Sequence, residues 1–292
     1  MAKLEAACDV DRFKGEGPMP HDEIVKRVPG KQAIVASITE SIDRAIIDAG
    51  TSLRVIANVA VGYNNIDVAA AKSRGIIVTN TPDVLTDATA DFTIALILAV
   101  TRRLGEGERM VRRGDWKGWA LDQLLGMQLG GRQLGIVGLG RIGRGVAARA
   151  AAFGMKVVHT TRSGGVPLDR LLSESDVVSL HVPLTPETRH LIGQPELARM
   201  KRTAYLVNTT RGPVVDEAAL AWALKNHLIA GAALDVYERE PEVHADLLTM
   251  ENVVLAPHLG SATMETRTAM ADLAARNAIA VVTGQPPLTP VP

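Results

Sequence analysis

The sequence predicts an α/β protein made of two doubly wound domains, each built on a parallel β-sheet. Short apolar runs rich in β-branched residues alternate with amphipathic stretches along the chain, and this alternation is typical of βαβ units. The pattern breaks at Thr81-Pro82 and starts again after a long apolar stretch. The length of 292 residues also suits two domains of ordinary size.

The first domain is predicted over residues 1–82. Its elements follow from apolar runs of strand length and from helical periodicity. The strands are predicted at Ala33–Ser37, Arg54–Val59 and Ile76–Asn80, and the helices between them at Ile42–Ala49 and Ile66–Arg74. Gly50 and Gly75 follow the two helices, at positions where a left-handed backbone often ends a helix.

The second domain is predicted over residues 83–282. It opens with a long helix at Thr86–Leu104, whose apolar stretch Phe92–Val100 is too short to span a bilayer and is therefore expected to be buried. Six strands follow, at Gln133–Val137, Lys156–Thr160, Asp176–Val182, Ala204–Asn208, Gly231–Val236 and Val253–Ala256. A helix at Thr263–Val282 ends the domain, and the Pro-rich tail 283–292 is expected to complete the first domain.

Charge and composition exclude several classes of function. The 32 basic and 32 acidic side chains cancel, so neither a general nucleic-acid-binding surface nor a polybasic membrane anchor is expected. Aromatic residues make up 3% of the chain, too few for platforms that stack on single strands. The lone Cys8 rules out an internal disulfide or a Cys-rich metal site, and no His pair has metal-ligand spacing. The first residues lack the apolar core of a signal peptide, so a cytoplasmic protein that acts on small molecules is expected.

A glycine-rich turn is the strongest local motif. It reads Gly138-Leu139-Gly140-Arg141-Ile142-Gly143 and lies between a predicted strand and a predicted helix. Gly138 permits the tight turn, Gly140 lets the backbone approach a pyrophosphate, and Gly143 lets the helix pack closely on the strand. The helix N-terminus then offers N–H groups to the phosphates. The motif predicts a Rossmann dinucleotide-binding domain, and the alternative is a plain strand–helix turn.

The end of the next strand indicates which dinucleotide binds. Sites for NAD usually place Asp or Glu there to bind the ribose 2′-hydroxyl, but this strand ends in Thr161-Arg162-Ser163 with no acid. A guanidinium suits a 2′-phosphate because it donates two parallel hydrogen bonds, and Ser163 adds a hydroxyl donor. We therefore expect NADP(H) to be preferred, with NAD(H) possible. The alternative is that Arg162 is a solvated surface residue.

Three segments place reactive side chains at the carboxyl ends of predicted strands, where ligands bind in open α/β sheets. The segments are Leu206–Gly212, Ala233–Pro241 and Leu255–Gly260. Together they supply an arginine, carboxylates and a histidine. A reacting centre is therefore expected at this edge of the sheet.

The chain resembles the D-isomer-specific 2-hydroxyacid dehydrogenase family, and within it most of all the glyoxylate/hydroxypyruvate reductases. The resemblance extends from about Ile34 to Thr283 and depends on six motifs in the family's order. The motifs are ANVAVGYNNID at 57–67, NTPDVLTDATAD at 80–91, GIVGLGRIG at 135–143, NTTRGPVVDEAAL at 208–220, GAALDVYEREP at 231–241 and APHLGSAT at 256–263. The resemblance implies that the Rossmann domain is inserted in a smaller, flavodoxin-like substrate domain.

The resemblance also implies that Arg211, Glu240 and His258 form the catalytic trio. Reduction of a 2-oxo acid adds a hydride to carbon and a proton to the carbonyl oxygen, which a histidine that titrates near neutral pH can supply. His258 is expected to act as acid in reduction and base in oxidation, with Glu240 fixing the ring and favouring imidazolium. Arg211 is expected to bind the substrate carboxylate and polarise the carbonyl. Glu238 competes with Glu240, but the family pattern places the carboxylate directly before Pro241.

Further contacts follow from the same resemblance. Backbone N–H groups of Val61 and Gly62 are expected to bind the substrate carboxylate, and Gly62 permits close approach. Asp235 is expected to contact the nicotinamide carboxamide. The groove of the cofactor is expected to be lined by Thr209, Thr210 and Gly260, and its adenosine side by Val182 and Pro183. Both catalytic roles have a structural alternative. Arg211 would then form a structural ion pair, and His258 would cap a helix.

Two departures from the family pattern concern length. The chain begins at a predicted helix, Ala2–Cys8, where relatives usually begin with the central strand of the smaller sheet. The substrate domain is therefore expected to lack its first strand, which would leave backbone groups of the neighbouring strands unpaired. The segment Gly164–Ser175 is shorter than in relatives, so the adenosine end of the cofactor site is expected to be more open.

We therefore expect an NADP(H)-preferring oxidoreductase that reduces small 2-oxo acids such as glyoxylate and hydroxypyruvate. The alternatives are another D-2-hydroxyacid dehydrogenase, of the phosphoglycerate or D-lactate type, and a cofactor-sensing protein of the co-repressor kind, which would keep the same trio. We expect a homodimer formed through the region Thr86–Leu104, because a lone surface helix is rarely so apolar.

Overall fold

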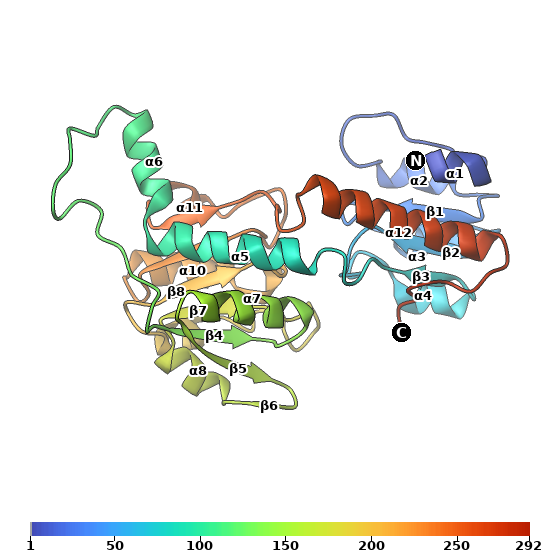
Figure 1. The fold of residues 1–292 in the computed structure, drawn as a ribbon. Coiled ribbons are helices and arrows are strands. Elements are labelled where there is room, and N and C mark those ends of the chain that lie inside the picture. The colour runs from blue at the N-terminus through green and yellow to red at the C-terminus, as the bar shows by residue number, and fades with distance from the viewer. Residues whose placement is uncertain (1) are drawn as a thin grey trace. The chain divides into compact units, whose positions relative to one another are not determined.

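The structure is a computed structural model that describes residues 2–292. The chain divides into two compact units (Figure 1). Unit 1 comprises the residues up to Leu85 together with Thr263–Pro292, and unit 2 comprises Thr86–Ala262. Each unit contains a sheet of mainly parallel strands with helices on both faces, which confirms the predicted α/β class.

Unit 1 is built on a three-stranded sheet in the order β1-β2-β3. The strands are β1 (Ala33–Ala36), β2 (Val55–Asn58) and β3 (Ile77–Thr79), and both pairs are parallel. Each strand begins and ends within one residue of the predicted one. The prediction succeeded because each apolar run ends at a polar or glycine-containing stretch that breaks the strand.

Two sets of helices cover the two faces of this sheet. Ile56 of β2 packs on one face with α2 (His21–Arg27), α3 (Arg44–Ala49) and α4 (Val68–Ser73). Val55 and Ala57 face the other way and pack with α1 (Ala2–Ala7) and α12 (Met264–Val282). The alternation follows from the two-residue period of a strand, so helices cover both faces of the small sheet, with the crossover helices α3 and α4 together on the Ile56 face.

The described N-terminal segment is helical, as expected. Residues 2–7 form α1, and β1 lies at an edge of its sheet. Within residues 2–292, no strand precedes β1.

The structure corrects the second domain boundary. The helix at Thr263–Val282 was expected to end the larger domain, but α12 belongs to unit 1. Ala274 and Ala278 of α12 pack against Val55 and Ala57. An apolar stripe on a helix shows that the helix is buried and does not show which sheet covers it.

Unit 2 is built on a seven-stranded sheet in the order β10-β9-β8-β7-β4-β5-β6. Six strands are parallel, and the short β6 runs antiparallel to β5. The strands are β4 (Gln133–Val137), β5 (Lys156–Thr161), β6 (Gly164–Gly165), β7 (Val177–Leu180), β8 (Tyr205–Asn208), β9 (Gly231–Leu234) and β10 (Val253–Leu255).

Helices cover both faces of the larger sheet (Figure 1). One face packs with α5 (Thr86–Thr101) and α7 (Arg141–Ala152). The other face packs with α8 (Leu168–Glu174), α9 (Gln194–Arg199), α10 (Glu217–Lys225) and α11 (Ala245–Thr249). No helix of the described residues is long and apolar enough to cross a membrane.

The long apolar helix ends earlier than predicted. It was expected to reach Leu104, but α5 stops at Thr101 and Arg103 adopts a left-handed backbone with φ of 52°. A separate helix, α6 (Leu104–Arg112), follows. The apolar residues of α5, among them Ile94 and Ile97, are buried in the core of unit 2, so packing inside the unit explains their composition.

The strand order of unit 2 creates a crevice for ligands. The chain passes from β4 to β5 and β6 on one side and then returns to β7 on the other side of β4. Loops from neighbouring strands diverge at such a switch point, and ligands bind there outside the carboxyl ends of the strands. The carboxyl ends of β4, β7, β8, β9 and β10 lead to the glycine turn, Val182, Arg211, Asp235 and His258.

Candidate active site

The glycine-rich turn at the end of β4 has the backbone that a phosphate site needs. Gly138 has a φ of 93°, and a methyl group there would overlap the His181 carbonyl. A methyl group at Gly143 would overlap the Gly138 carbonyl, whereas Gly140 borders open space. Because Gly140 has no side chain, it provides no side-chain cap to α7. The turn therefore fits a phosphate group placed over Gly140, at a helix end that attracts anions.

The polar residues after β5 lie at the far end of the cofactor crevice. Thr161 donates its hydroxyl hydrogen to the Gly164 carbonyl across 2.9 Å and closes the hairpin with β6. Arg162 is exposed, and its Nη2 lies 3.3 Å from Oε2 of Glu187. Ser163 lies in the turn between the two strands. Sequence reasoning missed Glu187, which would compete with any anion that Arg162 binds.

Two threonines after β8 fix the loop that leads to Arg211. The Oγ1 atoms of Thr209 and Thr93 lie 3.0 Å apart in the core of unit 2. Thr210 donates its hydroxyl hydrogen to the carbonyl of Val182, the residue expected on the adenosine side. These bonds tie the ends of β7 and β8 together, and Pro183 follows in the same segment.

Arg211 is held by a buried asparagine that sequence reasoning missed. The side-chain amide of Asn208 donates to the Arg211 carbonyl across 3.0 Å, and its oxygen accepts the N–H of Thr210 at 3.1 Å. Arg211 then caps the short 3₁₀ helix η1 (Gly212–Val214). Burial lowers the pKa of the Arg211 guanidinium, and the negative charge of Glu240 opposes that change. Arg211 is half-buried, and a partly desolvated guanidinium suits a carboxylate ligand.

His258 and Glu240 form a direct pair. Nδ1 of His258 lies 2.9 Å from Oε2 of Glu240, although 18 residues separate them in the sequence. The other carboxylate oxygen, Oε1, accepts the N–H of Tyr237 at 3.2 Å. Burial alone would raise the pKa of the Glu240 carboxyl, but the hydrogen bond and charge of His258 outweigh burial and lower it. The carboxylate therefore stays ionised and holds the imidazole by one nitrogen.

Asp235 fixes the turn that carries His258. Its Oδ1 accepts the N–H of Leu259 at 2.6 Å, and its Oδ2 accepts the N–H of Gly260 at 2.8 Å. Asp235 is fully buried, and burial raises the pKa of its carboxyl against these two bonds. His258 itself has a left-handed backbone with φ of 54°. The geometry gives Asp235 a structural task, and its expected contact with nicotinamide stays a prediction.

The loop expected to bind the substrate carboxylate lies in unit 1. The Val61 carbonyl accepts a hydrogen bond from the side chain of Asn80 at 2.7 Å. The Gly62 carbonyl accepts one from the side chain of Asn58, which is fully buried, at 2.9 Å. Asn58 ends β2 and Asn80 follows β3. Their positions at strand ends were a sequence signal for this role that was missed. They give the loop after β2 a fixed conformation.

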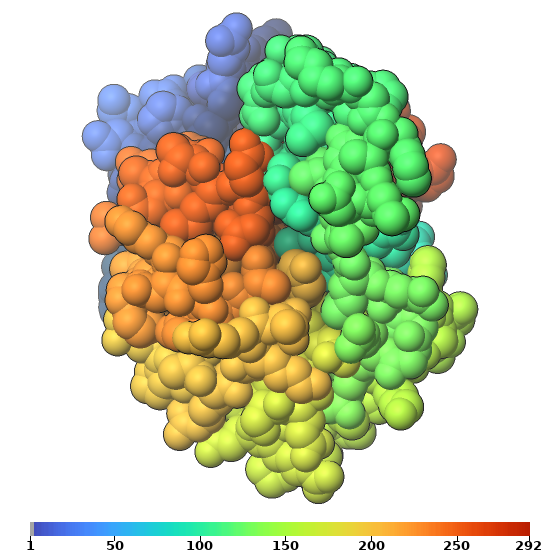
Figure 2. All heavy atoms as spheres, turned by 90° about the vertical axis from the view of Figure 1, so that its left-hand side faces the viewer, coloured from blue at the N-terminus to red at the C-terminus, as the bar shows by residue number. Residues whose placement is uncertain are grey.

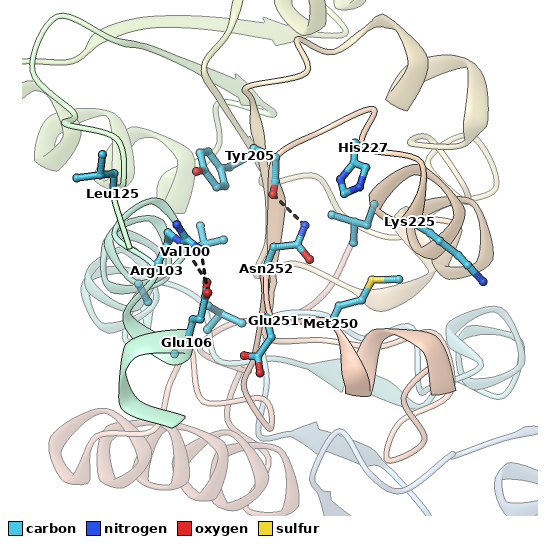
Figure 3. A pocket seen from close by; sticks show the side chains of 15 residues that line it. Val100, Arg103, Glu106, Leu125, Tyr205, Lys225, His227, Met250, Glu251 and Asn252 are labelled. Atoms are coloured by element: carbon cyan, nitrogen blue, oxygen red, sulfur yellow. Dashed lines mark hydrogen bonds and ion pairs between the residues drawn. The ribbon is translucent and has the colours of Figure 1, made fainter. Parts of the chain in front are cut away.

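A pocket of about 550 Å³ lies in unit 2, away from these residues (Figure 3). Its lining includes Tyr205, which begins β8, and Asn252, which precedes β10 and donates to the Ala230 carbonyl across 2.9 Å. Arg103 and Glu106, also in its lining, form an ion pair at 2.8 Å. The pocket is therefore at the amino ends of the strands, whereas the catalytic candidates follow the carboxyl ends.

The switch point, the glycine turn and the His–Glu pair together define a dinucleotide-dependent oxidoreductase. Sequence comparison then gives the family. A profile for the NAD-binding domain of the D-isomer specific 2-hydroxyacid dehydrogenases matches residues 94–260. The chain belongs to this family and is a nicotinamide-dependent oxidoreductase of CH–OH groups.

Similar proteins carry related names. The chain is 51% identical over 300 residues to a glyoxylate reductase of Korarchaeum cryptofilum, covering 98% of this chain and 90% of that protein. A crystal structure of a glyoxylate reductase from Paecilomyes thermophila matches with a TM-score of 0.89 and 36% identity, covering 100% of this chain and 94% of that one. An NADPH-dependent glyoxylate/hydroxypyruvate reductase from Sinorhizobium meliloti, solved with NADP and malonate, matches with a TM-score of 0.83 and 39% identity, covering 91% and 87%.

Proposed function

We propose that the protein is an NADP(H)-preferring reductase that converts small 2-oxo acids, such as glyoxylate and hydroxypyruvate, to 2-hydroxy acids. The observation that carries the proposal is the 2.9 Å pair between His258 and Glu240, with the half-buried Arg211 close enough for the charge of Glu240 to affect its pKa. The names of the similar proteins favour the same substrates.

The residues divide the reaction between them. The nicotinamide cofactor, when bound, supplies the hydride that the substrate carbon receives. Glu240 holds Nδ1 of His258, so Nε2 is left to give a proton to the carbonyl oxygen, which becomes the hydroxyl. Arg211 binds the substrate carboxylate and draws electron density from the carbonyl. In the reverse direction, Nε2 of His258 takes the proton back.

The cofactor contacts are part of the proposal. The turn 138–143 would hold the pyrophosphate, since Gly140 borders open space at the start of α7. Arg162 and Ser163 would bind a 2′-phosphate, and the absence of an acid after β5 removes the usual ribose acceptor of NAD sites. The segments at 182–183, 209–210 and 260 would line the groove, with Asp235 at the nicotinamide. The N–H groups of Val61 and Gly62 would bind the substrate carboxylate.

A substrate and cofactor panel tests the proposal. The purified chain would be assayed with glyoxylate, hydroxypyruvate, pyruvate and 3-phosphohydroxypyruvate, each with NADPH and with NADH. We expect the highest kcat/KM for glyoxylate or hydroxypyruvate with NADPH. A preference for phosphohydroxypyruvate or pyruvate would favour the phosphoglycerate or D-lactate type, and cofactor binding without turnover would favour a sensing protein.

We also propose a homodimer, but with its contact region in the segment after α5 instead of in α5 itself. Apolar side chains of α5 are largely used inside unit 2, but the segment that follows it exposes six large ones. They are Leu104, Val111, Trp116, Trp119, Leu121 and Leu125. In Figure 2 the green spheres of this segment lie at the surface. A second copy would cover them, because a monomer seldom exposes so many apolar side chains in one segment.

The cytoplasm is proposed as the setting of this activity. The single cysteine and the proposed preference for NADPH both suit a reducing compartment.

A further inference from the structure

The loop that carries Glu240 is joined to the start of α10 by a pair of carboxylates outside the catalytic trio. Oε1 of Glu217 accepts the N–H of Glu238 at 2.5 Å, and Oε2 accepts the N–H of His244 at 3.2 Å. In return, Oε2 of Glu238 accepts the N–H of Glu217 at 3.3 Å. The loop between Tyr237 and His244 is therefore bound near both of its ends by one side chain.

Glu217 is an unusual residue to bury. It is 5% exposed, although a glutamate is rarely buried without a partner for its charge. Both carboxylate oxygens accept backbone N–H groups from the loop, and such charge-assisted bonds are stronger than neutral ones. His190 holds the side chain of Glu238 in place, since its Nε2 lies 2.6 Å from Oε1 of Glu238. The carboxylate of Glu217 therefore fixes the loop through its backbone N–H groups.

Two more contacts hold the same loop from other sides. Gly212, next to Arg211, lies so close that a methyl group there would overlap the Tyr237 carbonyl. The hydroxyl of Tyr237 donates to the Ala256 carbonyl across 2.9 Å, two residues before His258. Tyr237 thus contacts the segments that carry the other two members of the trio, the Arg211 segment through its peptide and the His258 segment through its hydroxyl.

Glu240 depends on the backbone of Tyr237 for its orientation. Its Oε1 accepts the N–H of Tyr237, while its Oε2 meets His258. Glu217 binds the next N–H along the chain, that of Glu238. A change in the path of the loop would therefore move both the backbone of Glu240 and the N–H that orients its carboxylate.

We propose that Glu217 is a positioning residue for the reaction, acting through the loop 237–244 to hold Glu240 against His258. The inference rests on the proposed function, in which this pair moves the proton. The competing role is a purely structural one, in which Glu217 only stabilises the N-terminus of α10 by its negative charge.

Glu217→Gln tests this role with the smallest change in volume. The amide leaves one acceptor and turns the other oxygen into a donor that faces a backbone N–H. Glu196→Gln is the matched control: Oε2 of Glu196 accepts the N–H of Gly193 at 3.1 Å at the start of α9, in the same unit. Both variants should lose some stability in urea denaturation, so stability does not separate the two roles.

The pH profile and the rates do separate them. For Glu217→Gln we expect kcat for glyoxylate reduction to fall about tenfold, the KM for NADPH to change less than twofold, and the midpoint of the pH–rate profile to shift. The profile changes because a displaced Glu240 no longer holds Nδ1 of His258. Glu196→Gln should keep the wild-type kcat and midpoint. A folded Glu217→Gln with wild-type kcat and midpoint would overturn the inference.

A second readout does not require turnover. The titration of the Glu240 carboxyl, whose pKa His258 lowers, can be followed by NMR with glutamate-labelled protein and assigned with Glu240→Gln. Its midpoint should be higher in Glu217→Gln than in the wild type and in Glu196→Gln, because a displaced carboxylate loses the hydrogen bond to His258. If the wild type lacks reductase activity, the proposed function fails, and this titration alone decides whether Glu217 positions Glu240. An unchanged midpoint would overturn the positioning role.

Discussion

The hydroxyl of Tyr237 donates a hydrogen bond to the carbonyl of Ala256 across 2.9 Å. This bond joins the loop that carries Glu240 to the segment that carries His258, so one side chain links two members of the proposed catalytic trio. Burial raises the pKa of Tyr237 to about 12, which keeps the hydroxyl protonated as a donor at neutral pH.

Removing this hydroxyl should cost both stability and rate. For Tyr237→Phe we expect a loss of about 1–3 kcal/mol in the free energy of unfolding, because a buried carbonyl loses its donor. The value of kcat should fall while the KM for NADPH stays close to that of the wild type. Urea denaturation and steady-state kinetics measure the two effects. Tyr205→Phe, in the pocket at the opposite edge of the sheet, is the control and should leave kcat unchanged.

Glu240 should contribute stability that depends on pH. Its carboxyl pKa is lowered in the folded protein, so its contribution is complete above the pKa of the unfolded chain and is lost as pH falls through the folded value. The difference in unfolding free energy between wild type and Glu240→Gln should therefore shrink between pH 6 and pH 3. A difference that stays constant over this range would show that the ionised carboxylate does not stabilise the folded state.

Arg162 and Glu187 should set the cofactor preference between them. Loss of a charge-assisted contact to a 2′-phosphate costs about 1.5–3 kcal/mol, so Arg162→Ala should raise the KM for NADPH at least tenfold and leave that for NADH nearly unchanged. Glu187→Gln removes the carboxylate 3.3 Å from Arg162 and should lower the KM for NADPH. An NADPH preference that survives Arg162→Ala would contradict the assignment.

Gly140 separates cofactor binding from folding. A methyl group there meets no atom within 4 Å, and its backbone is extended rather than left-handed, so Gly140→Ala should keep the wild-type Tm. The added methyl would occupy the space over the turn and raise the Kd for NADPH, which fluorescence titration measures. Gly143→Ala is the contrasting variant, since its methyl would overlap a carbonyl and should lower Tm. Unchanged NADPH affinity in Gly140→Ala would place the phosphates elsewhere.

The exposed apolar segment should govern the oligomeric state. Sedimentation velocity should give a dimer for the wild type and a monomer for the double variant Trp119→Arg, Leu121→Arg, since both side chains are 81% exposed in the single chain. Phe153→Arg, an exposed aromatic position outside this segment, is the control and should remain dimeric. A wild-type protein that sediments as a monomer would contradict the proposed homodimer.

The sequence predicted the strands because they depend on local patterns, and the proposed trio was likewise chosen from local patterns. Each strand of unit 2 that precedes a catalytic candidate was placed within about two residues, and Arg211, Glu240 and His258 stand in short motifs. The end of α5 was missed because the left-handed backbone at Arg103 belongs to a residue type that usually continues a helix.

The supporting contacts could not be predicted because they join residues far apart in sequence. Glu217 and Glu238 are 21 residues apart, and Arg162 and Glu187 are 25 residues apart. Nothing in the periodicity of either segment indicates its partner. The unit to which α12 belongs could not be predicted for the same reason, because the apolar side chains of this helix would suit either sheet.

The central claim is that His258 supplies the proton, and one substitution tests it most directly. His258→Gln would be assayed for glyoxylate-dependent oxidation of NADPH beside the wild type, with NADPH binding measured to show that the variant is folded. Removal of a general acid lowers rates by roughly 10²- to 10⁴-fold, so we predict a fall in kcat of that size with unchanged NADPH affinity. A His258→Gln protein that retains nearly the wild-type kcat would contradict the account.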